Sequence, residues 1–133
     1  MPRRHFVPVA LFALAASSLG MVAHAVPDAA RGEQLYARCA ACHALTFDRV
    51  GPRHCGLLGR RAGRVPGFDY SPALKKSSIV WTEKTLDRFL TNPLAMVPGS
   101  SMTYVGVPGA SDRADLIAYL KSANSGVVCH VTP

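Results

Sequence analysis

Apolar residues recur at the spacing of a helical face in three stretches of this chain, and turn-rich segments separate the stretches. We predict amphipathic helices over residues 28–41, 82–92 and 111–126. No stretch has the strict alternation of apolar and polar residues that is typical of a half-buried strand. The pattern therefore predicts an all-α fold.

A residue with a helix-capping side chain stands at the start of each predicted helix, namely Asp28, Thr82 and Ser111. The second helix is expected to end at Asn92, because a proline disfavours helical geometry in the residue before it. The apolar faces that we expect to point inward carry Leu35 and Cys39, then Leu86, Phe89 and Leu90, and finally Leu116, Ile117 and Leu120.

The segment from Leu45 to Ser71 has no clear periodicity and contains five glycines and two prolines, so we expect a series of turns there. Such a long loop in a small domain is usually functional, and we expect it to wrap a bound group or another part of the molecule. A short helical turn is predicted near Ser71 and Pro72.

Residues 1–25 resemble a secretory signal peptide. Arg3 and Arg4 precede an apolar stretch, and Ala23-His24-Ala25 matches the small-x-small pattern of a cleavage site. We expect cleavage before Val26, which leaves residues 26–133 as a single domain in the periplasm. An uncleaved segment that tethers the domain to the membrane is the alternative interpretation.

The run Cys39-Ala40-Ala41-Cys42-His43 is the C-x-x-C-H signature of covalent c-type haem attachment. Two thiols one helical turn apart can both add to the vinyl groups of a haem, and the adjacent imidazole can bind the iron. The sequence therefore predicts one haem c, bound through Cys39 and Cys42, with His43 as an axial ligand.

Three other interpretations of this run are weaker. A thioredoxin-like redox pair normally follows a strand in a βαβ unit, and the predicted helices leave no such unit. A zinc ribbon needs a second ligand pair, but Cys55 and Cys129 are far apart in the chain. His43 could also be an ordinary surface histidine.

The chain is basic, which raises the question of its partners. Without Arg3 and Arg4 the formal net charge falls from +7 to +5, and seven arginines lie in the first half of the remaining domain. An exported protein meets no nucleic acid, and no element interleaves aromatic and basic residues as nucleic-acid binders do. We therefore expect the charge to steer the protein toward acidic redox partners.

The second axial ligand has several candidates in the sequence, namely Met96, Met102, His54 and His130, with Lys75, Lys76, Lys84 and Lys121 as weaker ones. Met102 follows Pro98 and Gly99, which allow the backbone to lie close to a flat group. This placement favours Met102 over Met96.

Further motifs are in the order found in class I c-type cytochromes, the family of mitochondrial cytochrome c and its soluble bacterial relatives. They are Gly51-Pro52, residues 56–60, residues 66–71, Trp81, Asn92-Pro93, residues 98–102 and residues 113–120. The chain resembles this family over nearly the whole of residues 26–133, and the resemblance implies the small cytochrome c fold around one haem.

The resemblance also implies roles for individual residues. His43 and Met102 would be the axial ligands, and the Pro52 carbonyl would accept a hydrogen bond from His43. Arg60, Tyr70 and Trp81 would lie near a haem propionate. The first and last helices would cross, with Leu35 on one side and Leu116, Tyr119 and Leu120 on the other.

Cys55 and Cys129 are not part of the family pattern. In an oxidising compartment two remaining cysteines favour a disulfide, which here would join the loop after Pro52 to the chain's tail. Two free thiols, or a second metal site with His54 and His130, are the alternatives.

These features predict an electron-transfer protein rather than an enzyme: a monomeric periplasmic carrier between redox proteins of a respiratory or photosynthetic chain. Contact with membrane complexes would be peripheral. A second hypothesis is the electron-accepting cytochrome subunit of a periplasmic dehydrogenase complex. A third is a sensor or peroxidase-like haem protein in which Met102 dissociates from the iron.

Overall fold

The computed structural model describes residues 26–130 together with Met1, and the predicted signal peptide otherwise lies outside the described residues. Six helices occur in the described part, and they are α1 (Ala29–Tyr36), α2 (Pro72–Lys76), α3 (Glu83–Thr91), α4 (Pro93–Met96), α5 (Ala110–Ser125) and α6 (Val127–His130). Extended pairing within residues 26–130 is limited to one isolated bridge between Arg61 and Val80. The predicted all-α class is confirmed.

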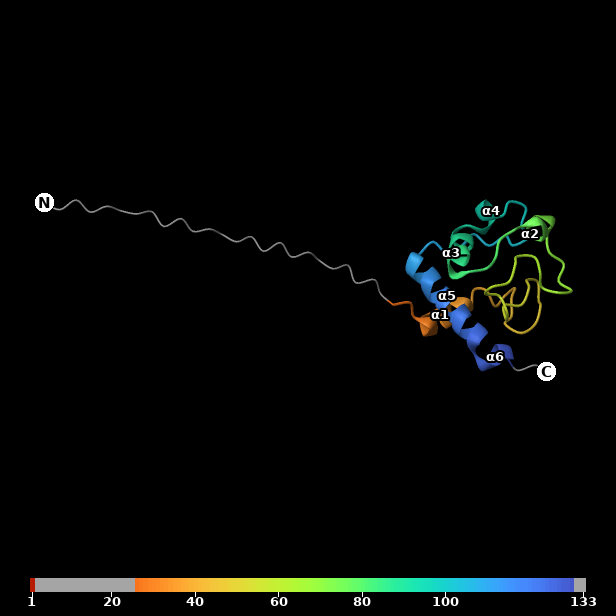
Figure 1. Cartoon of the computed structure of the whole chain (residues 1–133), viewed down its shortest axis with the longest axis horizontal. Coiled ribbons are helices and arrows are strands. Elements are labelled where there is room, and N and C mark those ends of the chain that lie inside the picture. The colour runs from red at the N-terminus through yellow and green to blue at the C-terminus, as the bar shows by residue number, and fades with distance from the viewer. Residues whose placement is uncertain (2–25, 131–133) are drawn as a thin grey trace.

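Helices α1 and α5, which come from near the two ends of the domain's sequence, cross each other in space (Figure 1). A Cβ atom built on Gly32 would lie 1.9 Å from the backbone oxygen of Asp115 and 2.9 Å from the Cβ of Tyr119. Any side chain at Gly32 would therefore push the two helices apart. The predicted crossing is confirmed, and Gly32 lies at a close contact between the two helices.

The predicted starts of α2 and α3 agree with the structure. The Ser71 hydroxyl accepts from the backbone of Leu74 at 3.4 Å, and Pro72 takes the first position of α2. Thr82 accepts from the backbone N–H of Thr85, whose hydroxyl accepts in turn from the backbone N–H of Thr82. Two N–H groups without helical partners are satisfied in this way.

Helix α1 is shorter than predicted, because it ends at Tyr36 and not at Ala41. After Tyr36 the backbone N–H groups of Ala37, Arg38 and Cys39 donate to the carbonyl three residues earlier. This tighter winding ends the regular helix. The haem motif therefore lies in a turn segment that follows α1.

Helix α5 begins at Ala110 after Gly109, one residue before the predicted start, and Ser111 does not cap it. It ends at Ser125 with Gly126 as its C-cap, as predicted. Its inward residues Leu116, Ile117 and Leu120 are buried, which confirms the predicted face.

Two short helices, α4 and α6, were not predicted. Helix α3 ends before Pro93, as predicted, but Pro93 also opens α4, and the Asn92 side chain accepts from the backbone of Ala95 at 3.1 Å. Helix α6 is four residues long, too short to produce a periodic pattern. It carries Cys129, whose sulfur lies 1.95 Å from that of Cys55.

The long loop between α1 and α2 runs along the side of the molecule away from the crossing, as Figure 1 shows in yellow and green. Together with α3 and α5 it encloses a cluster of buried apolar side chains. None of the helices in residues 26–130 is both long and apolar enough to cross a membrane.

Candidate haem site

One cavity, of about 330 Å³, lies between the end of α1, the long loop, α3 and α5. All eight residues predicted for the site line it, and they are Cys39, Cys42, His43, Pro52, Arg60, Tyr70, Trp81 and Met102. Most of the remaining lining side chains are leucine, phenylalanine and tyrosine. An apolar wall of this kind with a few polar groups suits a porphyrin ring.

The haem motif forms a single turn at the edge of the cavity. The backbone N–H groups of Cys42 and His43 both donate to the carbonyl of Cys39, at 3.0 and 2.9 Å. The two thiols are unpaired, with Cys39 half-buried and Cys42 exposed. Burial raises the pKa of the Cys39 thiol. Both sulfur atoms are thus available to a group in the cavity.

His43 is buried, and its Nδ1 lies 2.7 Å from the carbonyl oxygen of Pro52. Since a carbonyl can only accept, Nδ1 carries the proton and Nε2 keeps its lone pair. Burial lowers the pKa of His43, although the Pro52 hydrogen bond opposes this effect, so the ring is in the neutral form that binds metals. A Cβ on Gly51 would lie 2.3 Å from Cε1 of His43, so only glycine lets this loop pass so close.

Met102 is half-buried in the cavity wall, and its backbone N–H donates to the Ser100 hydroxyl at 3.2 Å. Gly99 supports this turn with a φ of +84°, which favours glycine. Met96 is absent from the lining residues of this cavity.

The other candidate axial ligands are exposed on the surface or lie against the His43 ring itself. His130 is exposed at the end of α6, and the four candidate lysines are also exposed. His54 does line the cavity, but its ring stacks on that of His43, with centroids 4.3 Å apart and an angle of 22° between the planes. A ring stacked on His43 does not lie across an iron atom from it.

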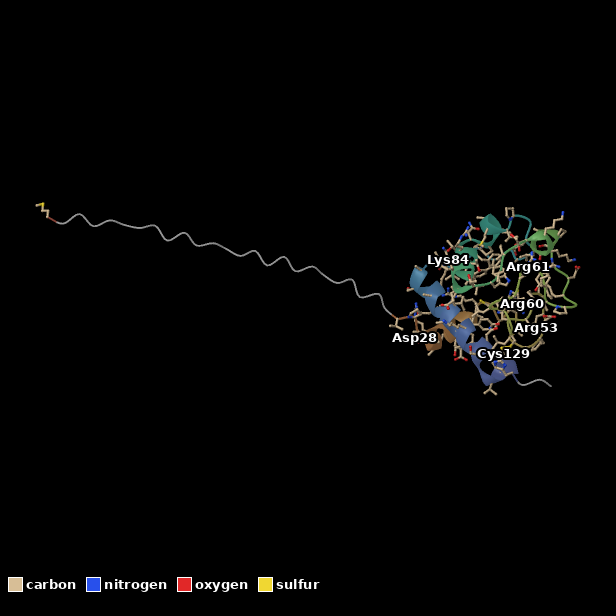
Figure 2. The ribbon with its side chains drawn as sticks, viewed as in Figure 1. Asp28, Arg53, Arg60, Arg61, Lys84 and Cys129 are labelled. Carbon is tan, nitrogen blue, oxygen red and sulfur yellow. A yellow bond between two sulfur atoms is a disulfide. The ribbon has the colours of Figure 1, made fainter. Side chains whose placement is uncertain are left out.

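Arg60 provides a direct test of whether the site fits a haem. Its Nη1 donates to the carbonyl of Cys55 and its Nη2 to the carbonyl of Arg53, both at 3.0 Å, while the buried Nε has no hydrogen-bond partner. A buried, unpaired donor on a half-buried cation suits a carboxylate such as a haem propionate. Figure 2 shows Arg53, Arg60 and Arg61 together on the long loop.

Tyr70 and Trp81 are buried in the wall of the same cavity. The Tyr70 hydroxyl accepts from the backbone N–H of Val65 at 3.4 Å, and burial raises the pKa of Tyr70. Trp81 packs edge-to-face on Phe89 of α3, with ring centroids 5.0 Å apart. The cavity therefore brings Arg60, Tyr70 and Trp81 together, although they are far apart in the sequence.

The family model for cytochrome c matches residues 29–124. The chain belongs to the cytochrome c family. Members of the family are electron-transfer proteins, not enzymes, and carry one covalently attached haem c. The expected class I c-type cytochrome and its single haem c are confirmed.

Individual relatives agree with this assignment. The chain is similar to cytochrome c2 of Rhodomicrobium vannielii, with 45% identity over 101 residues that cover 74% of this chain and 81% of the relative. It is also similar to cytochrome c2 of Blastochloris viridis, with 42% identity over 118 residues, 86% of this chain and 91% of the relative. Among solved structures, cytochrome cH from Methylobacterium extorquens matches with a TM-score of 0.70 and 41% identity over 71% of this chain and 98% of that chain. The fold is the small cytochrome c fold.

Sequence reasoning missed one group of residues at the site, the pair of Tyr36 and His54. The Tyr36 hydroxyl lies 3.1 Å from Nδ1 of His54, and burial lowers the pKa of His54 to about 3, so its ring is neutral. From the sequence alone, His54 was considered only as a metal ligand, either of the haem iron or of a second site with His130. The position of Tyr36 one turn before Cys39 was the available signal.

Proposed function

We propose that this cytochrome c is a soluble, monomeric, periplasmic carrier of single electrons, with His43 and Met102 as the axial ligands and thioether links to Cys39 and Cys42. When bound, the haem supplies an iron atom that changes between the ferric and ferrous states. The observation that carries the proposal is the meeting of both unpaired thiols, the Nε2 of His43 and the Met102 thioether in one apolar cavity.

The protein's own residues would hold the haem and limit rearrangement during electron transfer. The Pro52 carbonyl fixes the tautomer and direction of His43. The Met102 thioether would bind the iron in place of a substrate or oxygen, and its soft sulfur would favour the reduced state. Arg60 would offer its unpaired Nε to a propionate, and Tyr70 and Trp81 line the same cavity. No side chain is needed as a catalytic acid, base or nucleophile.

The expected setting is the periplasm, reached by means of the signal peptide at residues 1–25. The position of the Cys55 and Cys129 sulfurs supports a disulfide that forms in this oxidising space. Two relatives are named cytochrome c2, which supports a place among redox proteins of a respiratory or photosynthetic chain. The net positive charge would favour acidic partner surfaces.

Replacement of the two candidate methionines, Met102 and Met96, tests the ligand assignment. In the haem-loaded protein, Met102→Ala should abolish the near-infrared charge-transfer band of sulfur-ligated ferric haem. It should also lower the reduction potential and allow carbon monoxide to bind the ferrous protein. Met96→Ala, which changes a methionine outside the cavity wall, is the matched control and should behave as the wild type. Retention of the band in Met102→Ala would contradict the proposal.

A further inference from the structure

The imidazole of His54 lies flat against the ring of His43, and the proposed function gives it no role. The ring centroids are 4.3 Å apart and the planes differ by 22°. His54 also lines the cavity. A flat ring in this position covers one face of the His43 imidazole.

Tyr36, the last residue of α1, contacts the His54 ring. The Tyr36 hydroxyl lies 3.1 Å from Nδ1 of His54, and the two rings meet edge to face with centroids 5.7 Å apart. Tyr36 is buried and packs against Tyr119 of α5, with centroids 5.2 Å apart. The stack is thus braced by the crossing of α1 and α5.

The backbone around His54 is fixed as well. Its N–H donates to the carbonyl of Ala44 at 3.0 Å, and its carbonyl accepts from Nδ2 of Asn124 on α5 at 3.1 Å. Oδ1 of the same Asn124 accepts from the backbone N–H of Leu57 at 2.9 Å. Side-chain and backbone contacts therefore hold the His54 ring in place from α1, α5 and the loop before it.

The hydrogen bond to Pro52 fixes the direction of Nδ1 in His43 but still allows the ring to rotate about the Nδ1···O line. The flat His54 ring, stacked on one face of the His43 imidazole, blocks that rotation. We propose that His54 is a positioning residue that fixes the plane of the His43 ring, with Tyr36 as its support. This inference rests on the proposed role of His43 as an axial ligand.

Proton NMR of the haem-loaded ferric protein tests the inference, because the paramagnetic shifts of the haem methyl groups depend on the plane of the axial imidazole. His54→Leu fills similar space without a flat ring and should shift the haem methyl resonances. His54→Phe keeps a flat ring but loses the nitrogen that contacts Tyr36, so it should shift the resonances by less than His54→Leu does. His130→Ala, a change at an exposed histidine on α6, is the control and should leave the pattern unchanged.

A second variant tests the support from α1. Tyr36→Phe keeps the aromatic packing but removes the hydroxyl that contacts His54, and it should shift the same resonances by less than His54→Leu does. If His54→Leu and Tyr36→Phe both give the wild-type methyl pattern, the positioning role of His54 is wrong. If the proposed ligand set is itself wrong, the wild-type protein will lack the near-infrared band of sulfur ligation, which distinguishes the two failures.

Discussion

The backbone N–H of Asp28 donates to Oδ1 of Asp115 at 2.7 Å, and this bond joins the N-terminus of α1 to the middle of α5. Arg31 on α1 adds ion pairs to Asp112 and Asp115. Asp28 also caps its own helix, since its side chain accepts from the backbone of Ala30 at 2.9 Å. One carboxylate, that of Asp115, thus fixes the start of α1 against α5.

Asp115→Asn should reduce stability at neutral pH and weaken its pH dependence. The hydrogen bond from Asp28, followed by that from Arg31, holds the pKa of Asp115 below its ordinary value of 3.8. The unfolded chain therefore binds a proton before the folded protein does, so this contribution is present above pH 3.8 and is lost as the pH falls through the lower folded value. Urea unfolding of the haem-loaded protein between acidic and neutral pH measures the effect.

Glu33→Gln, at an exposed carboxylate on the same helix, is the control for this series. It should follow the wild-type stability curve at every pH. If Asp115→Asn also has the same stability as the wild type at every pH, the bond to Asp28 contributes nothing to folding.

Gly32→Ala should destabilise the protein by about 1–3 kcal/mol, the usual cost of forcing extra atoms into a packed contact. The new Cβ would meet the backbone of Asp115, which cannot rotate away as a side chain could. Glu33→Ala, one residue later on the exposed face, should change stability little. Chemical denaturation of both variants measures the difference, and equal stabilities would contradict the close contact of α1 and α5.

Arg60→Leu should lower both the stability and the reduction potential. The carbonyls of Arg53 and Cys55 each lose a donor, which costs about 1–3 kcal/mol when the group is buried. Loss of a half-buried positive charge from the wall of the haem cavity should favour the ferric state, so the potential should fall. Redox titration and chemical denaturation provide the two measurements.

Arg61→Leu is the matched control, because Arg61 is the neighbouring residue and its side chain is exposed (Figure 2). It removes the same formal charge but none of the hydrogen bonds of Arg60. Equal changes of potential in the two variants would show that Arg60 acts only through net charge and not through contact with the haem.

The paired variant Cys55→Ser with Cys129→Ser should be less stable than the wild type by about 4 kcal/mol in the chain-entropy model for a sequence separation of 74. In the wild type, alkylation under denaturing conditions should label these two cysteines only after reduction. Labelling of both without reductant, followed by mass spectrometry of their peptides, would rule out the disulfide.

Local sequence signals predicted some elements well. Helix α3 was predicted almost residue by residue because Thr82 caps its start and Pro93 directly follows its C-cap, Asn92. The predicted length of α1 was wrong, because the apolar spacing continues through Cys39 while the backbone tightens after Tyr36. A pattern of side chains does not report this change in hydrogen bonding.

Contacts between distant residues could not be predicted in the same way. The haem motif and the family resemblance selected eight residues that all line the cavity, but they gave no sign of the unpaired Nε of Arg60. The close approach of Gly32 to Asp115 depends on how α1 and α5 cross, which neither helix specifies alone. The stack of His54 on His43 likewise depends on the path of the long loop.

The place of Asn124 in the chain has a consequence for the order of assembly. This residue holds both His54 and Leu57, yet it is synthesised long after Cys39, Cys42 and His43. The wall around His54 therefore lacks these two contacts until the end of α5 has been made, and residues near the end of the domain complete the surroundings of a motif near its start.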